Sequence, residues 1–289
     1  SESIKDVGFS TSIQRDGLEA IRAMIAATDI LQPDRTVGVA TEAFRQATNG
    51  RQFATTINDT LCIPITIVPV HIGARWGFQT AVAVSDIPPT EVISSDCGAG
   101  SIQFSALYHG THEDSQRSGT VEALARSIRS RMINDSHASS SIDVVDRNEM
   151  LLRTLKDDIL QPMSHFKVQQ SLQLSTFQII AIGSQHSIFN QQRISLGHHV
   201  FNRDDVQRCW NRAVAIESIS TDRLIDWELE QSRLLVDGDD NDRNVQRRVD
   251  NAPFLVPKLT LLLAIMEKFD IAKNVTFYKT NGNCHALLT

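Results

Sequence analysis

Apolar residues along the chain follow two different periods, and their order predicts alternating helices and strands. The predicted elements of the first part are a helix over residues 16–28, a strand over 36–40, a helix over 42–48, a strand over 63–70 and a helix over 74–84. Asn49-Gly50 is a common helix stop and is expected to end the helix over 42–48. Strands that alternate with helices predict an α/β layer structure.

The rest of the apolar pattern predicts further elements of the same kinds. They are a hairpin over residues 91–104, a helix over 121–132, a strand over 177–182, a helix that starts after Asn202, a helix over 259–269 and a strand over 274–278. Asp204 and Asp205 suit the positive N-terminal end of the helix after Asn202. A chain of 289 residues can hold two cores, and we expect two domains, 1–110 and 111–289.

Charge and composition exclude several classes of protein. A net charge of -6 and a pI of about 5.8 argue against a nucleic-acid-binding surface, which is usually basic, but allow a local basic patch around a phosphate. No apolar run approaches the roughly 20 residues that span a membrane. Residues 1–17 lack the apolar core of a signal peptide. The four cysteines are scattered without a C-x-x-C pair, which favours free thiols in a cytoplasmic protein.

The most informative stretch is residues 91–104, Glu-Val-Ile-Ser-Ser-Asp-Cys-Gly-Ala-Gly-Ser-Ile-Gln-Phe. An apolar strand leads to Asp96, where the strand is expected to end. Gly98, Gly100 and Ser101 belong to a turn of small residues, through which backbone N–H groups can approach an anion closely. This order suits a phosphate or metal site. The alternative is a turn in which the aspartate caps its own loop.

Residues 39–53, Val-Ala-Thr-Glu-Ala-Phe-Arg-Gln-Ala-Thr-Asn-Gly-Arg-Gln-Phe, resemble the "A-T-x-A-x-R-x-A-x-N-x-x-x-F" signature of the exopolyphosphatase / guanosine pentaphosphate phosphohydrolase (Ppx/GppA) family. The stretch around Asp96 is similar to the "D-x-G-G-G-S-T-E" hairpin of that family. Residues 183–187, Gly-Ser-Gln-His-Ser, stand where the family has a "G-T-G-G-T" loop. A C-terminal helix, a short strand and Gly282 follow the family order, so the resemblance covers most of the chain.

The resemblance implies two actin-like domains around a cleft. It also implies hydrolysis of a terminal phosphate from polyphosphate or guanosine pentaphosphate, with Mg²⁺ as cofactor and a homodimer as the assembly. Asp96 would support the metal or position the attacking water, because phosphoryl transfer needs charge neutralisation and in-line positioning. Gly98, Gly100 and Ser101 would supply backbone donors to a phosphate oxygen. A purely structural glycine hairpin is the alternative.

Two further places in the chain match phosphate-binding positions of the family. Arg45 matches an arginine that faces the family's cleft, and its guanidinium suits phosphate recognition. A surface arginine on a helix is the alternative. Gly183 and Ser184 would belong to a second phosphate loop, in which Gln185 and His186 replace two glycines. These larger side chains either donate hydrogen bonds to a phosphate or fill its place.

The departures from the family pattern affect catalysis. Family members carry a general-base glutamate just before an Ala-Arg pair, in "S-G-x-E-E-A-R", and this chain has Gly73 at that position. Glycine cannot accept a proton, and general-base assistance is worth about 10²–10⁴-fold in rate. His71 is a substitute offset by two residues. Gln103 replaces the last glutamate of the hairpin and is a poorer ligand for Mg²⁺.

The beginning of the chain fits the family least well. Residues 6–12 resemble only loosely the "D-x-G-S-N-S" loop with which the family opens, and they lie too close to residues 39–53. Residues 1–14 are therefore interpreted as the connection before the first helix. The first strands of the N-terminal sheet are expected to be missing, which would leave one edge of that sheet open.

Three functions remain open at the level of sequence. The alteration of several elements of one site favours a degenerate family member with weak or no hydrolysis and possible binding of a phosphate ligand. The second is an active phosphohydrolase in which His71, His186 or Glu42 accepts the proton. The third is a structural or regulatory interaction protein. Turnover that depends on Mg²⁺ separates the second from the first, and retained phosphate affinity argues against the third.

Overall fold

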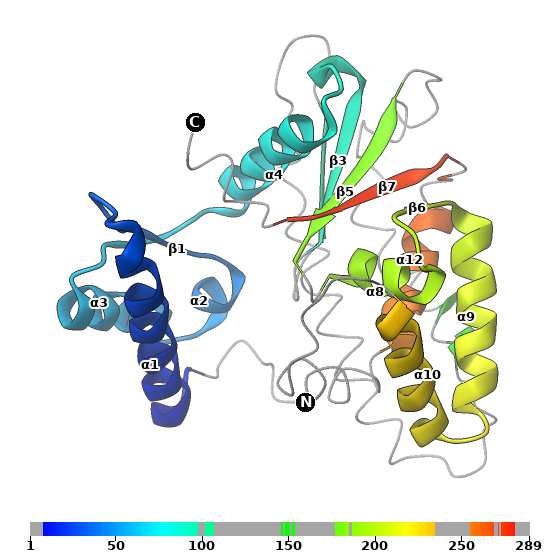
Figure 1. Ribbon diagram of the computed structural model, residues 1–289, viewed down its shortest axis with the longest axis horizontal. Coiled ribbons are helices and arrows are strands. Elements are labelled where there is room, and N and C mark those ends of the chain that lie inside the picture. Colours follow the sequence, from blue (N-terminus) through cyan, green and yellow to red (C-terminus); the bar gives the residue numbers. More distant parts are fainter. Residues whose placement is uncertain are drawn as a thin grey trace. The chain divides into compact units, whose positions relative to one another are not determined.

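The computed structural model describes residues 8–97, 102–106, 146, 148–150, 152–153, 177–184, 187–234, 255–268, 271 and 273–280 (Figure 1). The chain forms two compact units, Ser1–Gly73 and Ala74–Thr289, and each is considered by itself. The predicted helix over 121–132 and the Gly282 loop lie outside the described residues. In the described part of the chain, no helix is long and apolar enough to cross a membrane.

The first unit contains helices and a small parallel sheet. Its elements are α1 (Thr11–Thr28), the short 3₁₀ helix η2 (Asp29–Leu31), β1 (Gly38–Ala40), α2 (Glu42–Gln46), α3 (Gly50–Leu61) and β2 (Ile65–Ile67). Helix α1 starts earlier than predicted, because the side chain of Ser10 accepts a hydrogen bond from the backbone N of Ile13. Strands β1 and β2 pair in parallel, with Gly38 opposite Ile65. Proline on either side of β2 keeps this strand shorter than the predicted 63–70.

Helix α2 ends at Gln46, and Gly50 then starts helix α3, which the sequence analysis did not predict. A Cβ atom at Gly50 would lie 2.0 Å from the backbone O of Phe44. Only glycine therefore lets α3 start so close to α2. The residue that suggested the end of a helix is the one that allows the next helix to begin.

Asn49 and three phenylalanines hold the first unit together. The Asn49 side chain accepts a hydrogen bond from the backbone N of Phe9 at 2.7 Å and donates one to the backbone O of Phe9 at 2.9 Å. The rings of Phe9, Phe44 and Phe53 lie 5.0–5.5 Å apart between centroids. Three residues of the 39–53 motif, Phe44, Asn49 and Phe53, therefore serve the packing of this unit.

The second unit is built on a five-stranded mixed sheet. Its elements are the 3₁₀ helix η3 (Pro89–Glu91), β3 (Val92–Cys97), β4 (Ile102–Ala106), β5 (Gln178–Gly183), α8 (Ile188–Leu196), β6 (Val200–Phe201), α9 (Arg203–Glu217), α10 (Thr221–Leu234), α12 (Leu255–Lys268) and β7 (Val275–Lys279). The strand order is β4-β3-β5-β7-β6, in which β3, β5 and β7 are parallel and the outer strands antiparallel. The predicted α/β class is confirmed. The β3–β4 hairpin shares this sheet with β5, although the predicted domains 1–110 and 111–289 place them apart.

Helices cover both faces of this sheet. Helix α4 (Val70–Ser85) lies on one face, where Phe78 and Ala81 pack on Ile180 and Ile182 of β5. The larger core lies on the other face, under α8, α9, α10 and α12 (Figure 1). Within it, the indole Nε1 of Trp210 donates a hydrogen bond to Thr260 at 2.8 Å.

Helix α9 confirms the predicted helix after Asn202. The Asn202 side chain accepts a hydrogen bond from the backbone N of Asp205 at 3.0 Å, and the Asp205 side chain accepts one from the backbone N of Asn202 at 2.9 Å. This reciprocal pair is a capping box, which satisfies N–H groups that a helix otherwise leaves unpaired. The acidic first turn predicted from Asp204 and Asp205 is also observed.

Candidate functional site

Asp96 lies near the end of β3, in the interior of the sheet. It is paired with Gln103 on the antiparallel strand β4 and with Ile182 on the parallel strand β5. Directly opposed residues of neighbouring strands place their side chains on the same face of a sheet. Asp96 and Gln103 therefore both belong to the face that α4 covers.

Helix α4 comes unusually close to the sheet at Asp96. A Cβ atom at Gly77 would lie 3.1 Å from Oδ2 and 3.2 Å from Cβ of Asp96. The Ser105 hydroxyl also donates a hydrogen bond to the backbone O of Ala74 at 3.2 Å, which ties the start of α4 to β4. Glycine at position 77 thus permits the close packing that surrounds the Asp96 carboxyl with protein.

The pair Gly73 and Gly77 offers a matched test of this packing. Alanine stabilises a helix by about 0.5–1 kcal/mol over glycine when nothing opposes its Cβ. A Cβ at Gly73 meets no described residue within 4 Å, whereas one at Gly77 meets Asp96. We expect urea unfolding to show the gain for Gly73→Ala and to show no gain, or a loss, for Gly77→Ala. Equal gains for the two variants would contradict the described contact.

The Asp96 carboxyl has an unusual affinity for a proton. Burial raises its pKa to about 7, because desolvation disfavours the charged form. The residue as a whole is largely buried, with part of its surface exposed. Near neutral pH the carboxyl is divided between its neutral and charged forms, and a bound cation would favour the charged form.

The ends of β3, β5 and β7 place further polar groups at the same edge. Gly183 is the last residue of β5, Ser184 follows it, and Lys279 of β7 is paired with Gly183. The backbone N of Thr280 donates a hydrogen bond to the backbone O of Gly183 at 3.0 Å. Because the three strands are parallel, their carboxyl ends meet at one edge, where ligands bind in open α/β sheets. The structure thus brings Asp96, Gly183 and Ser184 to the same sheet edge.

Lys279 was missed in the sequence analysis. The predicted strand over 274–278 stopped one residue before it, whereas β7 runs from Val275 to Lys279. The signal available in the sequence was a lysine directly after the apolar residues of the predicted strand. That this strand pairs with β5 is evident only in the fold. The cationic side chain of Lys279 adds positive charge to the edge that carries Gly183.

Helix α8 begins after the loop that follows β5. The backbone N of Ser187 donates to the backbone O of Ser184 at 3.0 Å, and the Ser187 side chain accepts from the backbone N of Phe189 at 3.2 Å. A strand, a short loop and a helix N-terminus form a favourable setting for an anion. Gln185, His186, Gly98, Gly100 and Ser101 lie outside the described residues, and their predicted roles remain predictions.

The first unit holds the other predicted phosphate ligand. The Arg45 guanidinium donates to a carboxylate oxygen of Glu42 at 2.9 Å and to the backbone O of Val68. Both side chains of the Glu42–Arg45 pair are largely shielded from solvent. Arg45 is therefore held in place rather than extended into solvent. Glu42 is engaged by a cation, which argues against its predicted role as a proton acceptor.

The position of the family's general base is also defined. Gly73 lies in the first turn of α4, two residues after His71. Among the residues that the structure describes, no heavy atom lies within 4 Å of the point that a Cβ at Gly73 would occupy. His71 is half-buried in the same turn of the helix.

The described residues offer few metal ligands. They contain no group of three or more His, Cys, Asp or Glu side chains that could hold a metal ion. Near Asp96, the opposed residue is Gln103, which is 9% exposed and neutral. Mg²⁺ often binds to one or two carboxylates together with the phosphates of a substrate. Asp96 and the amide oxygen of Gln103 fit such a shared site better than an independent metal centre.

The fold defines an actin-like α/β protein in which Asp96, Gly183 and Ser184 lie at the carboxyl edge of the sheet. Residues 8–237 match the Ppx/GppA phosphatase family, and the chain belongs to this family. The resemblance seen in the sequence is confirmed. A comparison with curated proteins gave no match.

Solved structures share the fold at low sequence identity. The PPX-GPPA enzyme of Aquifex aeolicus is 14% identical with a TM-score of 0.61, and the match covers 98% of this chain and 84% of that one. An exopolyphosphatase from Cytophaga hutchinsonii is 15% identical with a TM-score of 0.62, over 100% of this chain and 85% of that one. An exopolyphosphatase-like protein reaches a TM-score of 0.65 at 13% identity, over 97% and 85%. These likenesses show the actin-like fold.

Proposed function

We propose that this chain binds a phosphate compound, polyphosphate or a guanosine phosphate, at the carboxyl edge of its five-stranded sheet and hydrolyses it weakly or not at all. The observation that carries the proposal is Gly73. It stands at the position of the family's general base, and no atom of the described residues lies within 4 Å of the point that its Cβ would occupy. Without a base, the attacking water loses assistance worth about 10²–10⁴-fold.

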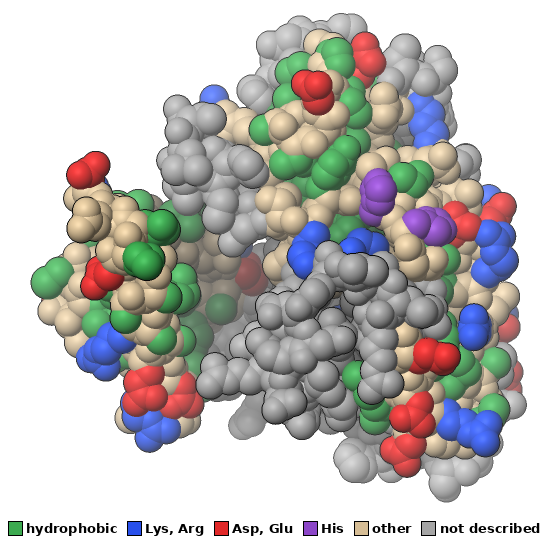
Figure 2. All heavy atoms as spheres, viewed as in Figure 1, with side chains coloured by type: hydrophobic (Ala, Val, Ile, Leu, Met, Phe, Trp, Pro, Cys, Tyr) green, Lys and Arg blue, Asp and Glu red, His purple; other side chains and the backbone are tan. Residues whose placement is uncertain are grey.

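Binding needs fewer groups than turnover, and several of them remain at the proposed site. Gly183 and Ser184 would offer backbone donors and Lys279 a cation to phosphate oxygens. Arg45, in the first unit, stays a predicted phosphate ligand on the basis of the family resemblance alone. Mg²⁺, if it binds, would be held by Asp96 and more weakly by Gln103, and would neutralise phosphate charge. On the face shown in Figure 2, basic side chains of the described residues are interspersed with acidic ones, which favours a small anion over nucleic acid.

One observation favours an active enzyme with a rearranged site. The pKa of Asp96 is raised to about 7, and a group with a pKa near the working pH is well suited to accept a proton from water. In that case Asp96 would act as the general base. A role as an interaction protein is the third candidate. We further propose a homodimer in the cytoplasm, on the basis of the family resemblance and of the composition.

Phosphate release and binding together test the proposal. Release from polyphosphate and from guanosine pentaphosphate should not exceed that of Asp96→Ala, while calorimetry in Mg²⁺ should detect binding. Lys279→Gln should weaken that binding about tenfold, the loss of one charge-assisted contact at the sheet edge. Release that disappears in Asp96→Ala would establish the active enzyme. If the folded chain neither releases nor binds phosphate compounds, the third candidate, an interaction protein, is favoured.

A further inference from the structure

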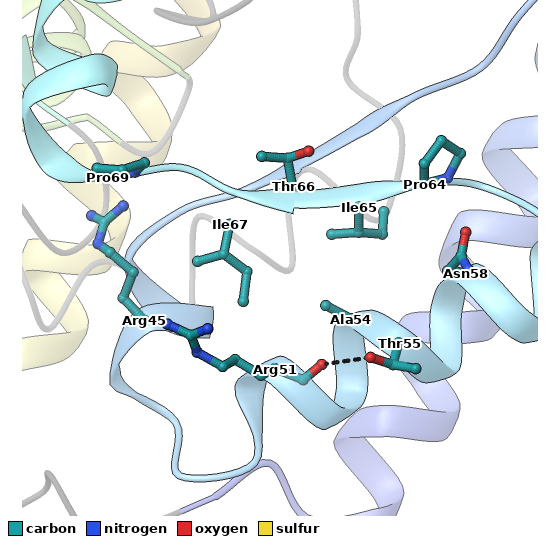
Figure 3. Close-up of a pocket in the computed structure, with 10 residues that line it drawn as sticks. All are labelled: Arg45, Arg51, Ala54, Thr55, Asn58, Pro64, Ile65, Thr66, Ile67 and Pro69. Carbon is teal, nitrogen blue, oxygen red and sulfur yellow. Dashed lines mark hydrogen bonds between the residues drawn. The ribbon is translucent and has the colours of Figure 1, made fainter.

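A groove of about 710 Å³ lies in the first unit, between β2 and one face of α3 (Figure 3). Its α3 wall carries Arg51, Thr55 and Asn58, which are exposed and follow one face of the helix. Ile65 and Ile67 of β2 turn their side chains toward this helix. The groove is thus apolar along its floor and polar along one wall.

The groove runs beside an open strand edge. Among the described residues, β2 pairs only with β1. The backbone N of Gly38 donates to the backbone O of Pro64, and the backbone N of Val68 donates to the backbone O of Ala40, each at 2.9 Å. Backbone groups of successive strand residues point in opposite directions within the sheet. The N–H and C=O groups of Ile65 and Ile67 therefore point away from β1, toward the open edge.

The two ends of the groove differ in charge. Arg45 and Arg51 lie at the end near Pro69, and Asn58 lies at the opposite end near Pro64 (Figure 3). The Arg51 side chain is exposed and has no ion pair or hydrogen bond with other described residues. Arg45 uses part of its guanidinium for Glu42 and Val68. The groove thus offers cationic donors at one end only.

We propose that this groove binds an extended peptide, which adds to β2 as a further strand and places a carboxylate against Arg51. A peptide supplies the alternating backbone donors and acceptors that Ile65 and Ile67 require, and its apolar side chains suit the floor of the groove. Guanidinium groups at one end match a single carboxylate through charge-assisted hydrogen bonds. A long polyanion would need cations along the whole groove and would meet isoleucine instead. The carboxylate belongs either to the chain terminus of the peptide or to an acidic side chain.

The test uses the full chain labelled with ¹⁵N and the probe acetyl-Lys-Thr-Val-Thr-Val with a free terminal carboxylate. The backbone amides of Ile65 and Ile67 should shift and gain protection from hydrogen exchange on titration. Arg51→Gln should weaken the affinity about tenfold, while Arg22→Gln, a matched exposed arginine on α1, should leave it unchanged. Ile67→Pro removes an outward N–H that β1 does not use, so it should reduce binding without loss of the folded spectrum.

Further arms identify the source of the carboxylate and the class of ligand. If the peptide with a terminal amide binds more weakly than the peptide acid, the site recognises a chain terminus. If an amidated peptide that ends in Glu regains the affinity, the site also accepts acidic side chains. Unchanged shifts at Ile65 and Ile67 up to the solubility limit of the peptides would overturn the proposal. The proposal would also be overturned, in favour of an anion site, if polyphosphate displaced the peptide and reversed all its shifts while the peptide acid and the peptide amide bound with equal affinity. Phosphate binding at the sheet edge of the second unit should survive Arg51→Gln, so the two proposals fail independently.

Discussion

The double variant Gly73→Glu/Gln103→Glu is expected to release phosphate from polyphosphate at least about 100-fold faster than the wild-type chain. The first change restores a carboxylate at the position of the family's general base, and the second restores a carboxylate beside Asp96. In the described part of the chain, nothing lies within 4 Å of a Cβ at position 73, so these residues leave room for the start of a glutamate side chain. An acidic residue also suits the first turn of a helix such as α4.

The matched control is Gly73→Gln/Gln103→Glu, which keeps the size of the side chain at position 73 and removes its charge. Initial rates of phosphate release in Mg²⁺ compare the two double variants and the wild-type chain. A base is identified when only the variant with glutamate at position 73 gains activity. Equal rates for the glutamine and glutamate variants would mean that the loss of the base does not limit this site. A wild-type rate already close to that of the double variant would favour Asp96 as the base.

Local patterns in the sequence were sufficient for many elements. Asn202 followed by two aspartates predicts the start of α9, since a capping box and an acidic first turn are local features. The hairpin over 91–104 is likewise observed as β3 and β4, with Asp96 opposite Gln103. In both places the residues that determine the structure lie within a few positions of one another.

Other features depend on residues that are distant in sequence. Asn49-Gly50 has the local pattern of a helix end, but its role is set by contacts with Phe9 and Phe44 that only the folded chain provides. The burial of Asp96 follows from its contact with Gly77, nineteen positions away, and no local pattern reports how closely a helix approaches a strand. Lys279 joins the edge of the sheet through its pairing with Gly183. The environment of the candidate site could therefore not be predicted from the sequence alone.

The motifs of this chain divide between packing and chemistry. In the first unit, Phe44, Asn49 and Phe53 make contacts that maintain the fold, and these residues are present. The altered positions are Gly73 and Gln103, where the family carries glutamates that are expected to accept a proton and to hold a cation. The proposed loss of hydrolysis is therefore compatible with an intact actin-like fold, because different side chains support the two properties.

The stability of the metal-free Asp96→Asn variant relative to wild type is expected to rise by about 4 kcal/mol from about pH 4 to above neutral pH. The folded-state pKa of Asp96 is raised to about 7, whereas an unfolded chain has the ordinary value of about 3.9. Between these values the folded state binds a proton that the unfolded state does not, so the free energy of unfolding falls as pH rises. The penalty is absent below about pH 4 and complete above about pH 7. Asparagine has no such titration.

Urea unfolding in EDTA at several pH values between acid and neutral measures this effect as a difference between the two proteins. The stability of wild type relative to Asp96→Asn should fall by up to about 1.4 kcal/mol per pH unit within that window. Asp34→Asn, at an exposed position, serves as the control and should follow wild type in parallel. Parallel curves for wild type and Asp96→Asn would mean that the Asp96 carboxyl titrates at its ordinary value. Its burial by α4 would then not produce the raised pKa on which the alternative assignment of Asp96 as general base depends.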